Sequence, residues 1–400
     1  MAREDYDIIV SGGGVAGLTA AAGFGAMGLR VLCVDPAAPV TVAEDEGADL
    51  RTTALLQPAV ALLDELGLWA RFAPHATALQ VMRIVDAGGP DPEVRVAHEF
   101  DAADISDQPF GWNLPNWLLR RELVAHLDMF PNVVFRPGVG TARVFTRDSG
   151  ARVTLSDGTV AEARLLVAAD GRNSPVREAL GIGVTTLRYG QKALAFAVTH
   201  PRPHDNVSTE IHRAGGPFTL VPLPDRDGQP CSAIVWMERG PEVRRLMALP
   251  EAAFEAEMTE RSAGLFGPLR LASRLTAWPI ISQIAEKFHG QRTALMAEAA
   301  HVVPPIGAQG LNMSLRDLAA LRELVREAPE EIGSPVMLER YHRRRYGDVR
   351  MRVTGIDMLN RASMAGSQPL RDLRAAGLRT LYGVAPVRRG LMRLGLGMGG

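Results

Sequence analysis

A glycine-rich turn near the N-terminus constrains the fold of this chain more than any other feature. Gly12, Gly14 and Gly17 form a Gly-x-Gly-x-x-Gly pattern. The pattern directly follows a short apolar run, residues 7–10, and precedes an alanine-rich stretch, residues 18–28. Gly12 permits the tight turn after a strand, Gly14 lets a pyrophosphate approach the backbone, and Gly17 allows a helix to pack closely on the strand. The pattern therefore predicts a strand, a turn and a helix.

The residues that follow complete a β-α-β unit with a dinucleotide fingerprint. A second apolar run, residues 30–34, ends at Asp35, which lies 21 positions after Gly14. An acid that binds ribose hydroxyls is expected about 20 residues after the glycines. The N–H groups at the helix start, on Val15 and Ala16, would face the phosphates. The sequence therefore predicts a dinucleotide site, against the alternative of a glycine-rich turn with no ligand, and it leaves FAD and NAD open.

Composition excludes several other classes of protein. The net charge is −1, so no global field favours nucleic acid. The two cysteines, Cys33 and Cys231, lie far apart without a Cys-x-x-Cys motif, so we expect no metal site and no disulfide framework. Isolated thiols suit a reducing cytoplasm. No apolar run approaches the roughly 18 residues that span a bilayer, and the acidic residues 1–5 do not resemble a signal peptide.

The C-terminal region is unusually basic. Between Pro369 and Gly400 six arginines stand against one acid, Asp372, and leucines are interspersed among them. One interpretation is an amphipathic segment that docks on anionic lipid. The other is a solvated helix with one face packed on the protein.

Two later segments add to the N-terminal fingerprint. Residues 170–177 read Asp-Gly-Arg-Asn-Ser-Pro-Val-Arg, and residues 297–312 contain Pro304-Pro305 before Gly310-Leu311-Asn312. Together, the three motifs resemble those of the single-component (class A) flavoprotein aromatic hydroxylases, of which para-hydroxybenzoate hydroxylase is the type member. Within that family, further cues resemble the ubiquinone-biosynthesis hydroxylases. These cues are residues 49–55, 66–69 and 385–393.

The resemblance implies FAD as cofactor, NAD(P)H as co-substrate and no metal. Asp170 and Arg177 would belong to the motif that serves both FAD and NAD(P)H, and Glu298 stands where the family has an Asp that binds the ribityl chain. The backbone N–H groups of Leu311 and Asn312 would face the flavin pyrimidine. The full set of implied cofactor contacts is Gly12, Gly14, Val15, Ala16, Gly17, Asp35, Arg51, Gln57, Asn116, Asp170, Gly171, Arg177, Glu298, Gly310, Leu311 and Asn312.

The residues of the last motif also suit a flavin on physical grounds. A helix that begins at Asn312 would place its positive end beside the reduced ring and stabilise the anion. Gly307 and Gly310 would let the loop lie close to the ring plane. Pro304-Pro305 stiffens the approach, and in the family a carbonyl at the Pro305 position faces the reacting end of the substrate.

Four residues of this motif, including two departures from the family pattern, affect its interpretation. The usual Gly-Asp of the family is Ala297-Glu298 here, and Ala308 replaces a frequent Gly. Because Glu is one methylene longer than Asp, the ribityl contact must be re-aimed or water-mediated. His301 is expected to orient the loop through a backbone hydrogen bond rather than to act as a base.

The expected fold class is α/β. It combines a Rossmann-like FAD-binding domain with an inserted mixed β-sheet substrate domain and a C-terminal helical region. The FAD-binding domain is expected to be discontinuous, because residues 184–282 change to proline-rich turns and alternating segments. The expected ranges are 1–75, 105–183 and 283–335 for the FAD-binding domain, 76–104 and 184–282 for the substrate domain, and 336–400 for the C-terminal region with its basic tail.

The expected function is hydroxylation of an aromatic ring, a polyprenyl phenol intermediate of ubiquinone biosynthesis, with NAD(P)H and O₂ through a C4a-hydroperoxyflavin. Alternatives are the same chemistry on a soluble aromatic acid or secondary metabolite, a flavin-dependent reductase or cyclase, and a non-catalytic flavin-binding assembly subunit. Expected partners are a quinone-biosynthesis complex and a membrane surface contacted by the basic tail, with no nucleic acid. The expected location is the cytoplasm, peripheral on the inner face of the membrane.

Overall fold

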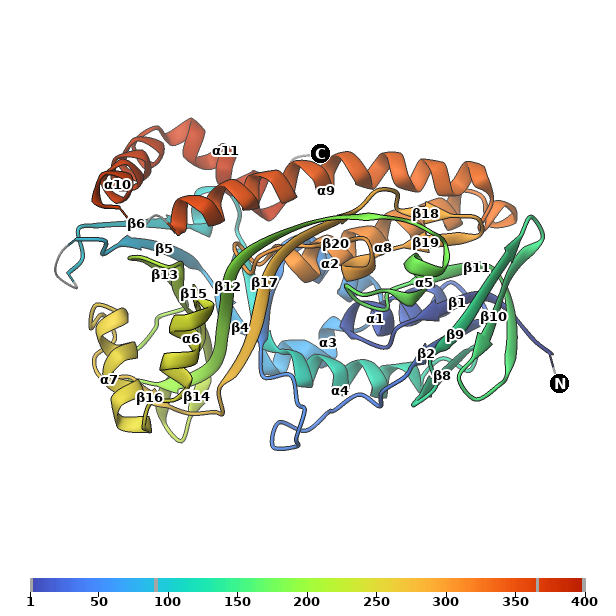
Figure 1. The fold of residues 1–400 in the computed structure, drawn as a ribbon, viewed down its shortest axis with the longest axis horizontal. Coiled ribbons are helices and arrows are strands. Elements are labelled where there is room, and N and C mark those ends of the chain that lie inside the picture. The colour runs from blue at the N-terminus through green and yellow to red at the C-terminus, as the bar shows by residue number, and fades with distance from the viewer. Residues whose placement is uncertain (1–2, 90–92, 365–366, 398–400) are drawn as a thin grey trace.

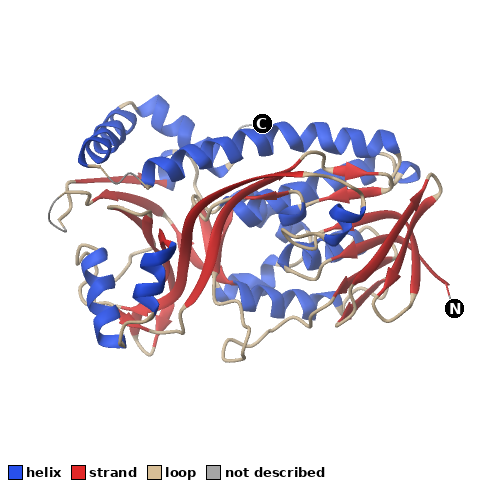
Figure 2. Ribbon diagram, viewed as in Figure 1, coloured by secondary structure: helices blue, strands red, loops and turns tan. Residues whose placement is uncertain are grey.

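Two large β-sheets lie next to each other and are bridged by the long helix α9 (Pro335–Ser363) in the computed structural model (Figure 1). Residues 3–89, 93–364 and 367–397 are described. The long strands β12 (Val184–Thr199) and β17 (Thr276–Ala285) curve from the second sheet toward the first, as Figure 2 also shows. The two sheets therefore meet along these strands and under α9.

The first sheet is the nucleotide-binding one. Its strand order is β18-β19-β11-β1-β2-β8, and the five strands from β19 to β8 are parallel. β9 and β10 extend it as an antiparallel hairpin from β11, with Asp157-Gly158 in the turn between β10 and β11, as predicted. Its strands are β1 (Arg3–Ser11), β2 (Val31–Asp35), β8 (Val133–Pro137), β9 (Thr141–Arg147), β10 (Gly150–Leu155), β11 (Val160–Ala168), β18 (His289–Gly290) and β19 (Thr293–Leu295).

The second sheet is mixed. Its order is β20-β17-β12-β15-β14-β13-β5-β6, with β16 on β12; all neighbours are antiparallel except β13 and β5. A small sheet, β3-β7-β4, lies apart from it. The predicted α/β fold with a mixed second sheet is confirmed. The remaining strands are β3 (Thr52–Leu56), β4 (Thr77–Leu79), β5 (Val81–Asp86), β6 (Val96–Asp101), β7 (Gly111–Pro115), β13 (Val207–His212), β14 (Pro217–Arg226), β15 (Gln229–Arg239), β16 (Arg270–Leu271) and β20 (His301–Val302).

Two predicted helices are shifted: α1 covers Val15–Gly25 rather than residues 18–28, and α8 starts early. α8 begins at Gln309, three residues before the expected Asn312, because Ala308 takes a left-handed conformation (φ 55°) that ends the loop earlier. Besides α9, the α-helices are α1 (Val15–Gly25), α2 (Gln57–Glu65), α3 (Trp69–Phe72), α4 (Asn116–Leu127), α5 (Pro175–Ala179), α6 (Gly240–Met247), α7 (Glu251–Arg261), α8 (Gln309–Glu327), α10 (Gln368–Gly383) and α11 (Ala385–Leu396).

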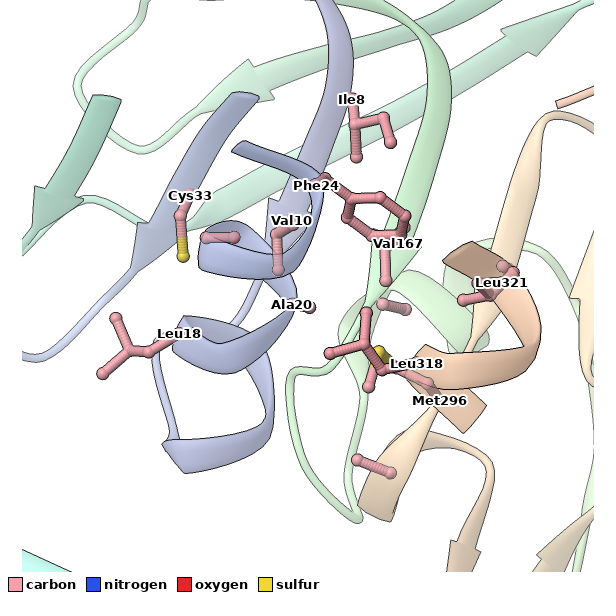
Figure 3. Close-up of a cluster of buried hydrophobic side chains, with 14 of the residues drawn as sticks. Ile8, Val10, Leu18, Ala20, Phe24, Cys33, Val167, Met296, Leu318 and Leu321 are labelled. Atoms are coloured by element: carbon pink, nitrogen blue, oxygen red, sulfur yellow. The ribbon is translucent and has the colours of Figure 1, made fainter. Parts of the chain in front are cut away.

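The core of the first domain is built where α1, the parallel strands and α8 meet. Figure 3 shows Phe24 of α1 beside Val167 of β11, with Leu318 and Leu321 of α8 near Met296. Their side chains are fully buried. Burial of such side chains contributes about 1.5–3 kcal/mol each, which fixes α1 and α8 against the same sheet.

The basic C-terminal region forms α10 and α11, which lie over β6 at the far end of the second sheet (Figure 1). Among the described residues, no helix is long and apolar enough to cross a bilayer. Part of the predicted arginine and leucine pattern lies outside the described residues. This part comprises the side chains of Leu373, Arg374, Leu378, Arg379 and Leu381 and the last residues, 398–400.

Two glycines of the N-terminal turn have different structural roles, which a matched pair of substitutions can test. A Cβ on Gly17 would lie 1.9 Å from the carbonyl oxygen of Gly12, whereas a Cβ on Gly14 meets no described atom within 4 Å. We expect Gly17→Ala to lower the free energy of unfolding by about 2–3 kcal/mol, as overpacking does. Gly14→Ala, at a helix N-cap, should cost less than about 1 kcal/mol. Urea unfolding of both variants checks this, and equal losses would contradict it.

Candidate FAD site

The N-terminus of α1 is open toward an anion. Gly14 is its N-cap, no side chain caps the helix, and its first turn carries no acid. The space around the Gly14 Cβ position is free of described atoms within 4 Å. The first N–H groups of a helix have no intrahelical acceptor and form its positive end. The cradle therefore fits a pyrophosphate at Val15 and Ala16.

Asp35 is fixed at the end of β2. Its Oδ2 accepts a hydrogen bond from the N–H of Gly13 (2.6 Å), and its Oδ1 accepts one from the N–H of Ala37 (2.8 Å). The carboxylate is therefore held beside the glycine-rich loop, where a ribose hydroxyl would reach it.

The Asp-Gly motif lies directly against this loop. The N–H of Ala169 donates to the carbonyl of Ser11 (2.8 Å), and Gly171 takes the turn with φ 85°. Oδ2 of Asp170 accepts from the N–H of Val176 (3.2 Å), but its Oδ1 is buried without a hydrogen-bond partner among the described residues. Burial raises the pKa of Asp170. A buried acceptor without a donor is costly, so this oxygen marks a place for a ligand hydroxyl or N–H.

Arg177 connects the two later motifs. Its guanidinium donates to the carbonyls of Ala299 and Arg172, at 2.9 Å each, and burial lowers its pKa. Because its guanidinium donates to these two carbonyls, Arg177 holds the Asp-Gly motif against the segment that contains Ala299.

Glu298 projects from a short 3₁₀ turn (Ala297–Ala299) with 46% of its side chain exposed, and it pairs with Nε of Arg172 at 3.3 Å. Ala297 takes a left-handed conformation (φ 54°), as Ala308 does. The backbone at both positions therefore has the shape that favours glycine, although this chain carries alanine.

Arg51 lies where the two sheets approach each other. Its guanidinium makes two bonds to Asp49 (2.8 and 2.7 Å) and stacks on Trp278 of β17, 4.2 Å from the ring centroid. Although burial alone raises the pKa of Asp49, Arg51 lowers it. Asn116 joins this cluster, because its amide donates to Asp49 (3.0 Å) and accepts from the hydroxyl of Thr53 (2.7 Å).

Gln57 has a different local role. Its amide nitrogen donates to the hydroxyl of Ser106 (3.0 Å) and to the carbonyls of Gln108 (3.1 Å) and Pro109 (2.9 Å). The side chain therefore anchors the loop before β7.

The N-terminus of α8 provides a second open helix end. No side chain caps it, and a Cβ on Gly310 would meet no described atom within 4 Å. Because the helix begins at Gln309, the N–H groups without an intrahelical acceptor include those of Gly310 and Leu311, whereas that of Asn312 points back to Ala308.

Asn312 contributes through its side chain instead. Its Oδ1 accepts from the N–H of Leu56 (2.9 Å), and its Nδ2 donates to the carbonyls of Ala54 (2.7 Å) and Ala308 (2.6 Å). The amide joins β3 to the start of α8. Pro305, in the preceding loop, is exposed.

We expected His301 to orient the loop through a backbone hydrogen bond, and this expectation is wrong: its ring pairs with a carboxylate. Its Nε2 lies 2.6 Å from Oδ2 of the fully buried Asp317, which also accepts from the N–H of Ala297 (3.1 Å). Oδ1 of Asp317 accepts from Nε of Arg345 (2.8 Å). Although burial alone raises the pKa of Asp317, the charges of His301 and Arg345 lower it.

The sequence interpretation missed Asp317, Asp49 and Trp278. Asp317 had a signal, since it lies on the apolar stripe of α8 beside Leu318 and Leu321, where an acid is rare unless it is paired. Trp278 had none, because its partner Arg51 is distant in sequence.

Two open helix ends, a fixed acid and an unpartnered buried acceptor together suit a dinucleotide that extends from a diphosphate to a planar ring. A scan of protein families matches residues 5–354 to the FAD binding domain. The chain belongs to this family, and it is an FAD-dependent monooxygenase that resembles the aromatic hydroxylases.

The similarity to known proteins extends over nearly the whole chain. Ubiquinone hydroxylase UbiL of Rhodospirillum rubrum is 33% identical over 396 residues, 98% of this chain and 89% of its own length. The 3-demethoxyubiquinol 3-hydroxylase of Escherichia coli is 28% identical, with both chains covered completely. Among solved structures, p-nitrophenol 4-monooxygenase PnpA of Pseudomonas putida has a TM-score of 0.79 at 21% identity, over 99% of each chain, and so shares the fold.

The buried Asp317 cluster gives a stability prediction. We expect Asp317→Asn to lower the free energy of unfolding by about 3–5 kcal/mol, because it removes the buried carboxylate that accepts from Arg345, His301 and Ala297. Since the folded pKa is lowered, the contribution is present above the unfolded value of about 4 and is lost as pH falls through the folded pKa. Urea unfolding between neutral and acid pH measures both the loss of stability and its dependence on pH. Glu327→Gln, at an exposed ion pair, is the control with little expected change; a similarly small change in Asp317→Asn would refute the prediction.

Glu298 gives a prediction about FAD affinity. We expect Glu298→Ala to weaken FAD binding about tenfold, which corresponds to about 1.4 kcal/mol, and to leave the fold intact, because the side chain is half exposed. Glu298→Asp, which restores the residue usual in the family, is the matched control and should retain affinity. Flavin fluorescence titration measures this, and unchanged affinity in Glu298→Ala would show that the side chain does not contact the ribityl chain.

Proposed function

We propose that this enzyme hydroxylates the ring of a polyprenyl phenol intermediate of ubiquinone biosynthesis, using NAD(P)H and O₂. The observation that carries the proposal is the near full-length similarity to ubiquinone hydroxylases. When bound, FAD would accept a hydride from NAD(P)H and activate O₂, so that one oxygen atom enters the ring and the other leaves as water.

The loop that precedes α8, residues 297–308 and called the flavin loop below, packs on an apolar part of the second sheet that suits an apolar substrate. An apolar cluster joins the second sheet, Ile306 of the flavin loop and Ile356 of α9. The sheet face that contributes Ala193 and Met237 continues through small or apolar side chains. By register, these are Ala195 and Ala197 of β12, Val221 and Leu223 of β14, and Ala233 and Val235 of β15. A carboxylate substrate would need a cation, and none of these positions carries one; Arg51, which lies over Trp278 on the same face, is already paired with Asp49.

The protein residues would bind and orient the substrate rather than transfer protons. The carbonyl of Pro305 would face the reacting end of the ring, as in the family. The open ends of α1 and α8 would hold the diphosphate and the flavin pyrimidine. Asp35, Asp170 and Glu298 would hold the ribose and ribityl hydroxyls, and the apolar wall would exclude water.

A polyprenyl substrate would reside in lipid, so the enzyme would have to contact a membrane. The C-terminal region supports such a contact. Exposed apolar residues accompany exposed arginines on α11, and such a surface suits anionic phospholipid. We place the enzyme in the cytoplasm, at the inner face of the membrane and in contact with a quinone-biosynthesis complex.

An oxygen-transfer assay tests the proposed function. The purified enzyme should oxidise NAD(P)H faster when a prenyl phenol is added, and the product should gain one oxygen atom from labelled O₂. Gly14→Val, which blocks the diphosphate cradle, is the inactive control. A deletion strain should accumulate a prenyl phenol that lacks one hydroxyl. Oxygen transfer only to a soluble aromatic acid would support the alternative substrate class, and substrate reduction without oxygen transfer would refute hydroxylation.

A further inference from the structure

The side chain of Gln309 joins three elements at the flavin loop. It is 8% exposed. Its Nε2 donates to the carbonyl of Gly307 in the loop (2.8 Å) and to that of Gly395 in α11 (3.0 Å). Its Oε1 accepts from Nη1 of Arg352 on α9 (3.1 Å). One buried amide therefore connects the flavin loop to the C-terminal helix.

The last turn of α11 docks on the flavin side through its carbonyls. Leu394 accepts from Arg352 (3.3 Å), and Leu396 accepts from Arg316 of α8 (3.0 Å). The last carbonyls of a helix lack intrahelical donors and form its negative end. The contact is therefore directional, and it fixes the end of α11 beside Gln309.

The same network reaches the other end of the flavin loop. Arg352 donates to Asp348 (2.8 Å), which accepts from Arg345 (2.6 Å). Arg345 donates to Asp317 (2.8 Å), and Asp317 accepts from the N–H of Ala297 (3.1 Å). A displacement of α11 therefore disturbs a continuous chain of bonds that ends beside Glu298.

α11 has a second, open face opposite the docked one. Met392 and Leu396 are buried, at 7% and 3% exposure. The opposite face exposes apolar side chains at helical spacing, and the exposed Arg393 borders it. These outer residues are Val387, Leu391 and Leu394, with Arg393 at the edge of the face. The helix can therefore contact the flavin loop and a lipid surface at the same time.

We propose that Gln309 is a positioning residue that couples α11 to the flavin loop, so that docking of α11 on anionic phospholipid and binding of FAD strengthen each other. This rests on the membrane contact of the proposed function. A bilayer that holds the outer face orders α11 in its docked position, and FAD then binds a loop that is already ordered. Because coupling between two sites is reciprocal, FAD must strengthen lipid binding by the same factor.

The test measures both directions on the full chain. FAD affinity is titrated by flavin fluorescence with vesicles rich in phosphatidylglycerol and with pure phosphatidylcholine vesicles. We expect the Kd for FAD to fall about fivefold or more with the anionic vesicles. Co-sedimentation should show the FAD-saturated protein bound more tightly than the apoprotein by the same factor.

Two kinds of variant separate the steps. Gln309→Met, close in size, should still bind vesicles while the coupling factor falls to one. Gln309→Glu, which keeps the acceptor for Arg352 but loses the donor to Gly395, should do the same. The double variant Leu391→Gln, Arg393→Gln on the outer face should lose vesicle binding and keep its FAD affinity without vesicles. Melting curves verify that each variant folds.

The outcomes are distinct. Vesicle binding by the wild type with an unchanged Kd for FAD overturns the coupling, and full coupling in Gln309→Met overturns the role of Gln309. Absence of vesicle binding in the wild type refutes the membrane contact and the inference with it. The hydroxylation chemistry is measured separately by oxygen transfer.

Discussion

The carboxylate of Asp317 is the interaction on which the flavin side of the structure depends. It is fully buried on α8 and receives donors from three separate segments, at Ala297, His301 and Arg345. An isolated buried charge costs far more than a domain can tolerate, so the carboxylate is stable only when these donors are in place. The packing of α8 against α9 and the path of the loop that precedes α8, residues 297–308, are therefore one cooperative unit.

The backbone of that loop keeps a shape that its side chains do not favour. Ala297 and Ala308 both take left-handed conformations, which cost an L-residue roughly 1–2 kcal/mol. Strain of this size persists only when the surroundings determine the conformation. Asp317 holds Ala297 through its N–H. Asn312 holds Ala308, because its side-chain amide bonds to the carbonyl of Ala308 and to β3. The loop thus keeps its geometry although this chain has alanine where the family often has glycine.

Sequence reasoning was accurate where the determining physics is local. The glycine-rich turn, the Asp157-Gly158 hairpin and the alternating strands of the second sheet depend on residues a few positions apart. It was wrong for the start of α8 and for the partner of His301, because both depend on tertiary contacts: Asn312 bonds to residues some 256–258 positions away. An acid on an apolar helical stripe was a signal, not used, that Asp317 has a buried partner, but nothing in the sequence identifies which residue.

The two faces of the second sheet differ in the size of their side chains. On one face large side chains such as Phe196 and Trp236 pack against α6 and α7. On the other face, the strands present Ala193, Ala195 and Ala233. These alanines are 4–5% exposed, so protein covers this face as well. Small side chains in period two let the covering elements approach the sheet closely at crystal-like density, while the large side chains of the opposite face supply most of the packing that holds the sheet in place.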